Sequence, residues 1–186
     1  MERGSEDIDR RLVARIVASS DTAAFGELVK RHQAHVRNFL RKLTRDQELA
    51  EDLSQDCFLH AWDKLHTYSG TGSVIGWLLK VAYTTFLQSR RKSKRYDEIL
   101  DQVGHGEAAS GRHVTTESDE ITDLDRFLAA LEPEERAVMI LSYACGLSHR
   151  EIAEVTGLPV GTAKSIIFRA KEKIRKRFDI QSHQHG

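Results

Sequence analysis

Proline and cysteine are scarce in this chain of 186 residues, which has two of each. The prolines, Pro133 and Pro159, lie in the last third, so most of the chain contains no residue that forces a helix to end. The cysteines, Cys57 and Cys145, form no CxxC pair. This usage indicates a reducing compartment and gives no reason to expect a disulfide framework.

Long hydrophobic runs are also missing. The most apolar stretch, residues 77–87, is too short for a membrane span and contains Lys80 and two threonines. Residues 1–11 lack the apolar centre of a signal peptide. The formal net charge is +0, so bulk charge identifies no partner. We therefore expect a cytoplasmic protein without membrane insertion, whose partners must be inferred from where its charges lie.

Enzyme motifs are absent from the sequence. It contains no P-loop, HExxH motif, nucleophile elbow or glycine-rich dinucleotide fingerprint. The terminal SHQHG could bind a metal adventitiously, but no second ligand cluster supports a site, and His32 and His35 are awkwardly spaced for one ion. We predict no catalytic residue, no cofactor and no metal site.

Helical periodicity is what the chain has instead. Apolar residues recur at spacings of three and four, and no segment alternates as a strand would. Helices are expected over residues 8–18, 23–43, from the Thr44 region to 65, and from Ser73 into the basic end at 90–95. Asp21 or Thr22 is expected to cap the second, a Thr44–Gln47 capping box the third, and Ser73 the fourth.

The periodicity fails between Tyr96 and Asp123, where glycine, serine, threonine and histidine dominate. Acidic residues there face a single Arg112 in opposite charge. Such a composition predicts a flexible acidic linker over residues 96–122, which is too long for a structureless loop inside one compact domain. The predicted fold is therefore all-α, with two small helical domains at residues 8–95 and 123–180.

A helix-turn-helix is predicted in the second domain. Pro133 suits the first turn of the helix before it, and Ser148 with Glu151 forms a capping box for a short helix that Gly157 closes. A long basic helix starts near Val160 and ends near residue 178. This order of short helix, tight turn and basic helix is typical of duplex DNA readers.

The faces of these helices follow from their spacing. Apolar positions of the short helix can pack on Ala163, Ile167 and Ala170, which leaves Lys164, Ser165, Phe168 and Arg169 on the open face. Basic residues further along suit phosphates, namely Lys171, Lys173, Arg175, Lys176 and Arg177. The alternative is a solvated amphipathic helix on a small bundle.

A second basic feature ends the fourth helix at residues 90–95. With Lys80, Trp77 and Tyr83 it interleaves cations and aromatic rings, which suits single-stranded nucleic acid. A core tryptophan and a charged helix end that complements the helix dipole would look the same. The residues alone leave both interpretations open.

Three segments together resemble the extracytoplasmic-function sigma factors of bacterial RNA polymerase. AEDLSQDCFLHAWDKL, residues 50–65, resembles their conserved-region-two helix, and YSGTGSVIGWLLKVA, residues 68–82, resembles their promoter-melting loop and the helix after it. GTAKSIIFRAKEKIR, residues 161–175, resembles their region four. The similarity covers nearly everything outside the linker and the extreme ends.

The resemblance implies a sigma factor that binds core RNA polymerase and promoter DNA and is controlled by an anti-sigma factor. It implies polymerase docking by Asp52, Gln55 and Asp56. It implies minus-ten recognition by Tyr68, Ser69, Gly70, Thr71, Gly72, Ser73, Trp77, Lys80, Tyr83, Thr84, Gln88, Arg90 and Arg91. It implies minus-thirty-five recognition by Lys164, Ser165, Phe168 and Arg169, with Lys171, Lys173 and Lys176 at phosphates.

Departures from the family pattern concern promoter sequence. The family often has asparagine where Thr84 stands, aspartate where Gln88 stands and a basic residue at Ile166. Two other functions remain alternatives: a sigma-like interaction protein that sequesters an anti-sigma factor, and a stand-alone helix-turn-helix regulator. The regulator would explain the second domain without the polar face and loop of the first.

Overall fold

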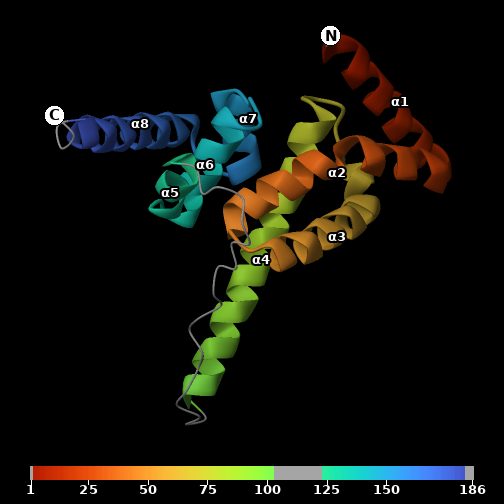
Figure 1. Ribbon diagram of the computed structural model, residues 1–186. Coiled ribbons are helices and arrows are strands. Elements are labelled where there is room, and N and C mark those ends of the chain that lie inside the picture. The colour runs from red at the N-terminus through yellow and green to blue at the C-terminus, as the bar shows by residue number, and fades with distance from the viewer. Residues whose placement is uncertain (1, 103–122, 183–186) are drawn as a thin grey trace.

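Helices make up all the regular structure in the computed structural model, which describes residues 2–102 and 123–182 (Figure 1). The first domain contains α1 (Glu2–Ser19), α2 (Thr22–Thr44), α3 (Gln47–Lys64), the 3₁₀ turn η1 (Leu65–Thr67) and α4 (Val74–Gln102). The second contains α5 (Asp123–Ala129), α6 (Pro133–Tyr143), α7 (His149–Thr156) and α8 (Val160–Ser182). The all-helical, two-domain fold is confirmed. Most of the predicted linker, residues 103–122, lies outside the described residues.

Helix caps in the first domain are mostly those expected. Asp21 caps α2 by accepting a bond from the Ala24 N–H at 2.9 Å, and Ser73 caps α4 by accepting from the Gly76 N–H at 3.1 Å. The capping box predicted at Thr44 is wrong. Thr44 is the last residue of α2, so the cap of α3 falls to Asp46, which accepts from the Leu49 N–H at 2.9 Å.

The extent of α4 differs from the expectation. The helix continues through the basic segment to Gln102, whereas irregular structure was predicted from Tyr96. The acidic residues that follow Arg95 support the helix, since Glu98 pairs with Lys94 one turn earlier at 3.8 Å. Charge composition therefore misplaced the end of this helix by about two turns. α1 is likewise longer than predicted and begins at Glu2.

The second domain has the predicted helix-turn-helix. Pro133 occupies the first turn of α6, and the Ser148–Glu151 capping box opens α7 with bonds of 3.3 and 2.9 Å. Gly157 ends α7 with a φ of 76°, a left-handed conformation that glycine adopts without strain. These local signals set the angle at which α8 leaves α7.

The buried apolar residues of both domains form one continuous cluster. In the first domain α2, α3 and α4 pack together, and in the second α6, α7 and α8 do the same. The two domains also touch, because α7 packs on α4 and α6 packs on α2. Figure 1 shows α5–α7 beside α2 and the upper part of α4, while α8 projects away from the first domain. Among the described residues no helix has the length and hydrophobicity to cross a membrane.

A buried polar cluster fastens α1 to α2. Asp9, only 4% exposed, accepts a bond from Arg31 Nε at 2.6 Å and lies 2.9 Å from His32 Nε2. His32 Nδ1 is buried, and no partner for it is found in the part of the chain described. A neutral ring that donates from Nε2 to Asp9 fits this, because its bare Nδ1 leaves no buried donor unsatisfied. The sequence suggested His32 only as a metal ligand, and its pairing with Asp9 was not predicted.

The cluster predicts a pH dependence of stability. Burial lowers the pKa of His32 below its ordinary 6.5, although the neighbouring Asp9 opposes the shift. Below pH 6.5 the unfolded histidine binds a proton that the folded one does not, so the free energy of unfolding should decrease as the pH falls. The effect should reach at most about 1.4 kcal/mol per pH unit. Urea titrations at several pH values between 7.5 and 5 measure it.

The control is His32→Gln, which retains a donor for Asp9 but cannot titrate. Its unfolding free energy should depend less steeply on pH than that of the native chain over the same range. Equal slopes for the two proteins would contradict the assignment of a neutral, buried His32.

Candidate nucleic-acid interface

A polar face runs along α3 opposite its buried stripe. Leu53 and Cys57 are buried, whereas Asp52, Gln55 and Asp56 are exposed, as the helical spacing predicted. Leu59 follows Asp56 by three residues and is 66% exposed. It continues the same face, and its signal in the sequence was its position off the apolar stripe. A single exposed leucine is common on protein surfaces, so Leu59 extends this face without identifying its partner.

The loop between η1 and α4 is tied by its own side chains. Gly70 and Gly72 have φ values of 76° and 75°, and the Tyr68 hydroxyl donates to the Gly72 carbonyl at 2.9 Å. The hydroxyls of Ser69 and Thr71 lie 2.7 Å apart. Two left-handed glycines therefore fold the loop back on itself and hold its hydroxyl groups together.

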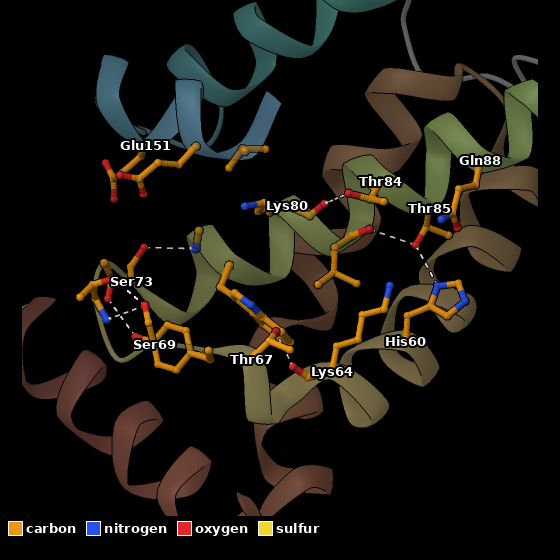
Figure 2. Close-up of a pocket in the computed structure, with 18 residues that line it drawn as sticks. His60, Lys64, Thr67, Ser69, Ser73, Lys80, Thr84, Thr85, Gln88 and Glu151 are labelled. Atoms are coloured by element: carbon orange, nitrogen blue, oxygen red, sulfur yellow. Dashed lines mark hydrogen bonds between the residues drawn. The ribbon is translucent and has the colours of Figure 1, made fainter. Parts of the chain in front are cut away.

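A pocket of about 540 Å³ opens between this loop, α4, the end of α3 and α7, which contributes Glu151, Glu154 and Val155 (Figure 2). Lys80, Thr84 and Gln88 line it from successive turns of α4, and each side chain is exposed. The Tyr68 and Trp77 rings pack edge to face at its loop end, with their centroids 6.1 Å apart. Cations, hydroxyls and aromatic rings around a concave space suit an unstacked base and its phosphates.

Further pocket residues come from α3 and η1 and were missed from sequence. His60, Lys64 and Thr67 line the pocket from α3 and η1. His60 Nδ1 lies 3.1 Å from the Thr85 hydroxyl, which itself donates to the Val81 carbonyl at 3.0 Å. His60 and Lys64 lie four residues apart and one turn beyond Asp56. That polar spacing was the signal that could have placed them on one face.

Tyr83 does not join this face. Its ring is 4% exposed and stacks on Phe86 with centroids 6.3 Å apart. Burial raises the pKa of its hydroxyl, and the nearby Glu134 carboxylate on α6 adds to the shift. Arg90 and Arg91 are exposed beyond the pocket, with the Arg90 guanidinium 6.0 Å from the Phe86 ring centre. The structure thus separates Tyr83 from the other predicted minus-ten residues.

The open face of the helix-turn-helix lies on α8. Lys164, Ser165, Phe168 and Arg169 are all exposed, and Phe168 is 66% exposed. The apolar positions that were expected to face α7 are buried, namely Ala163, Ile167 and Ala170. Ile166, where the family often has a basic residue, is also buried. α8 therefore presents a mixed basic and aromatic surface in its first turns.

The predicted phosphate contacts on α8 differ in their surroundings. Lys171 Nζ lies 5.4 Å from the ring centre of Tyr143, and Lys173 Nζ lies 3.5 Å from Glu135. Both partners belong to α6. Lys176 is exposed one turn further along. The first two lysines must therefore leave their α6 partners, at a small cost for exposed pairs, before they can bind phosphate.

Metal and thiol chemistry find no support in the ranges described. No group of three histidine, cysteine, aspartate or glutamate side chains gathers there as a metal site would require. Burial raises the pKa of Cys57 to about 12 and that of Cys145 to about 11, which disfavours reactive thiolates. The terminal histidine-rich residues, 183–186, lie outside the described residues.

Two family models match the chain, in the order of its domains. The model for Sigma-70 region 2 matches residues 28–96, and the model for Sigma-70, region 4 matches residues 121–174. The first match contains α3, the loop and most of α4. The second contains the helix-turn-helix.

Curated relatives match over most of the chain. The ECF RNA polymerase sigma factor RpoE of Cereibacter sphaeroides is 31% identical over 157 residues, which cover 84% of this chain and 87% of RpoE. The ECF RNA polymerase sigma factor SigE of Mycolicibacterium smegmatis is 31% identical over 166 residues, covering 85% of this chain. The match spans 64% of SigE, less than two thirds of its length.

Solved structures share the fold. The sigma factor RpoE of Bartonella quintana, in complex with the anti-sigma factor NepR, has a TM-score of 0.67 and 26% identity. That match covers 84% of this chain and 97% of the other. CnrH, in complex with the cytosolic domain of CnrY, has a TM-score of 0.66 and 24% identity over 93% of this chain and 98% of CnrH. At that identity the second match supports the fold alone.

The loop glycines generate a prediction about stability. Gly72→Ala places a residue with a Cβ at a φ of 75°, which should lower the free energy of unfolding by about 1–2 kcal/mol. If the loop instead changes conformation to avoid this strain, its affinity for single-stranded DNA should fall. The matched control is Gly26→Ala in α2, where an added Cβ meets nothing within 4 Å. It should stabilise the protein by about 0.5–1 kcal/mol. If Gly72→Ala changes neither urea stability nor fluorescence-detected DNA binding, the loop conformation has no role.

Proposed function

This chain belongs to the extracytoplasmic-function sigma factors of bacterial RNA polymerase, and on that premise we propose a role for each of its exposed polar surfaces. Such factors direct promoter-specific initiation and are not enzymes. The observation that supports the assignment best is the presence of two different DNA-facing surfaces on one chain. One is a pocket lined by cations and aromatic rings, and the other is the open face of a helix-turn-helix.

The pocket of the first domain is assigned to the melted minus-ten element. Extruding a base from a duplex costs only about a few kcal/mol, so binding alone can offset it without nucleotide hydrolysis. The Tyr68 and Trp77 rings offer apolar surface, while Lys64 and Lys80 offer charge for the backbone. The loop hydroxyls supply hydrogen-bonding groups at the entrance. This combination fits an unpaired base better than it fits a duplex groove.

The exposed face of α8 is assigned to the duplex minus-thirty-five element. Lys164, Ser165 and Arg169 lie in the first turns of the second helix, where a recognition helix meets base edges in the major groove. Phe168 offers apolar contact for a thymine methyl group. Lys176, further along, suits a phosphate.

The α3 face is assigned to core polymerase. Asp52, Gln55 and Asp56 are exposed on α3, and none of them lines the pocket. Binding there would leave the DNA surfaces free to act. The protein would therefore work in the cytoplasm, where the polymerase is.

Control by an anti-sigma factor is part of the proposal. The solved RpoE relative is bound to the anti-sigma factor NepR. Within residues 2–102 and 123–182 no metal cluster is found, and burial raises the pKa of both thiols, so neither metal binding nor a reactive thiolate in that part of the chain suggests a sensor. A separate protein that covers the docking face or the basic helix would supply the regulation.

Charge reversal tests the docking face. Asp52→Lys with Asp56→Lys should weaken binding to core polymerase by about tenfold or more. The two introduced ammonium groups would repel a partner surface that is complementary to the native carboxylates. Both residues are exposed, so the fold should survive. The control is Asp7→Lys with Glu27→Lys, which makes the same charge change at exposed sites on α1 and α2. A pull-down in which both double variants bind core polymerase alike would remove the assignment.

Alanine substitutions test the recognition helix. Arg169→Ala should lower discrimination at the minus-thirty-five element by about 1–3 kcal/mol, as expected for a lost base contact. Lys176→Ala should weaken binding about equally for all sequences, as expected for a lost phosphate contact. Electrophoretic mobility shifts on a set of single-base promoter variants separate the two. If Arg169→Ala weakens every variant equally, its contact is to the backbone.

A further inference from the structure

Helix α1 contacts the elements on both sides of the loop that precedes α4. It packs on η1 and on α4, which that loop connects. Among the described residues, those that line the minus-ten pocket include none from α1. An effect of α1 on the pocket would therefore be indirect, through the elements on which it packs.

Two turns of α1 are fixed on α2 by the buried polar cluster. Asp9 accepts a bond from Arg31 Nε at 2.6 Å and lies 2.9 Å from His32 Nε2. The Nη2 group of Arg31 also donates to the Ser5 hydroxyl at 2.8 Å, one turn before Asp9. The residue that follows Asp9 therefore has a defined position relative to the rest of the first domain.

That residue, Arg10, interacts with the hydroxyl group of Tyr68. Burial raises the pKa of this hydroxyl, whereas the charge of Arg10 and a hydrogen bond from it oppose the rise. The hydroxyl donates its own hydrogen to the Gly72 carbonyl at 2.9 Å. Its oxygen is therefore left to act as an acceptor, and a guanidinium has only donors. Arg10, Tyr68 and Gly72 thus form a chain of two hydrogen bonds that runs from α1 into the loop.

The turn at the end of this chain is costly to hold in one conformation. Gly70 and Gly72 both have left-handed φ values, and glycine loses more conformational freedom than any other residue when it is fixed. A hydroxyl that accepts a bond from a charged donor becomes a stronger donor itself, because successive hydrogen bonds polarise each other. The bond from Arg10 should therefore strengthen the bond from Tyr68 to Gly72 and restrict the loop.

We propose that Arg10 is a positioning residue for the minus-ten pocket: it donates to the Tyr68 hydroxyl and so holds the Gly72 turn in the conformation that forms the loop end of the pocket. The proposal rests on the assignment of this pocket to the melted minus-ten element. Arg10 lines no part of the pocket and need not touch the DNA. Its contribution is preorganisation, because a loop that is already ordered loses less entropy when the strand binds.

The order of the loop is measured first, in the full chain without DNA. In Arg10→Ala the NMR order parameters of the Gly70 and Gly72 amides should fall from about 0.85, the rigid range, toward about 0.6. Urea stability should change little, because Arg10 is exposed. Arg11→Ala is the matched control, since it removes the same charge from an exposed neighbouring position on α1. Unchanged order parameters in Arg10→Ala, or an equal fall in the control, would overturn the proposal.

A double-mutant cycle then tests whether Arg10 acts through Tyr68. Fluorescence anisotropy with a labelled single-stranded DNA pool of mixed sequence should show about threefold to tenfold weaker binding for Arg10→Ala than for the native chain. In a Tyr68→Phe background, which lacks the hydroxyl, Arg10→Ala should weaken binding no more than Arg11→Ala does. An equal loss in both backgrounds would mean that Arg10 attracts DNA by its own charge, and would overturn the proposal.

The two measurements separate this proposal from the pocket assignment on which it rests. A more mobile loop in Arg10→Ala with unchanged DNA affinity would refute the assignment of the pocket to the melted strand, and with it the role of Arg10 in binding. A weaker affinity with an unchanged loop would contradict positioning while leaving the pocket assignment intact. Agreement of both measurements, with the coupling to the Tyr68 hydroxyl, is the result that we expect.

Discussion

The Arg136 guanidinium is the interaction on which the relation between the two domains depends. Its N–H groups bind carbonyls from the α5–α6 turn and from the end of α2, so one planar group satisfies backbone acceptors in both domains. A lysine could not replace it, because a single ammonium cannot span carbonyls in such a fixed fork. On either side of this arginine the domains are in contact, α6 with α2 and α7 with α4.

The same geometry separates the functions of the chain. The α3 face and the first turns of α8 point outward, whereas the minus-ten pocket lies against the second domain. One surface of the chain is thus suited to duplex DNA and the other to unpaired DNA. Stacking and phosphate contacts at the pocket discriminate little between sequences, whereas a helix in the major groove reads base edges.

Most caps and turns could be predicted from the sequence, because their contacts are local. The Asp21 cap, the Ser148–Glu151 capping box and the Gly157 turn each involve residues within a few positions of one another, and each is found as predicted. The Thr44 prediction failed because Thr44 is the last residue of α2 and so cannot cap α3. The end of α4 was misplaced because acidic residues after Arg95 can form ion pairs along a helix, as Glu98 does with Lys94.

Contacts between distant segments could not be predicted in this way. The placement of Glu154 at the minus-ten pocket comes from packing between α4 and α7, whose residues are about 70 positions apart. The burial of Tyr83 was likewise not predicted from the sequence. The Asp9–His32 pair likewise depends on how α1 is aligned against α2, and hydrophobic periodicity within each helix does not predict that alignment. For the pocket itself, the loop and α4 residues were predicted, while His60 and Lys64 emerged only once α3 was placed beside α4.

Initiation by purified components tests the central claim most directly. Core RNA polymerase and this protein would transcribe a library of templates with randomised upstream sequence. The templates that yield RNA would then be sequenced. The account predicts two enriched elements at a constant spacing, one contacted as duplex by α8 and one melted at the pocket of the first domain. Enrichment of a single upstream element, or no RNA above that made by core polymerase alone, would contradict it.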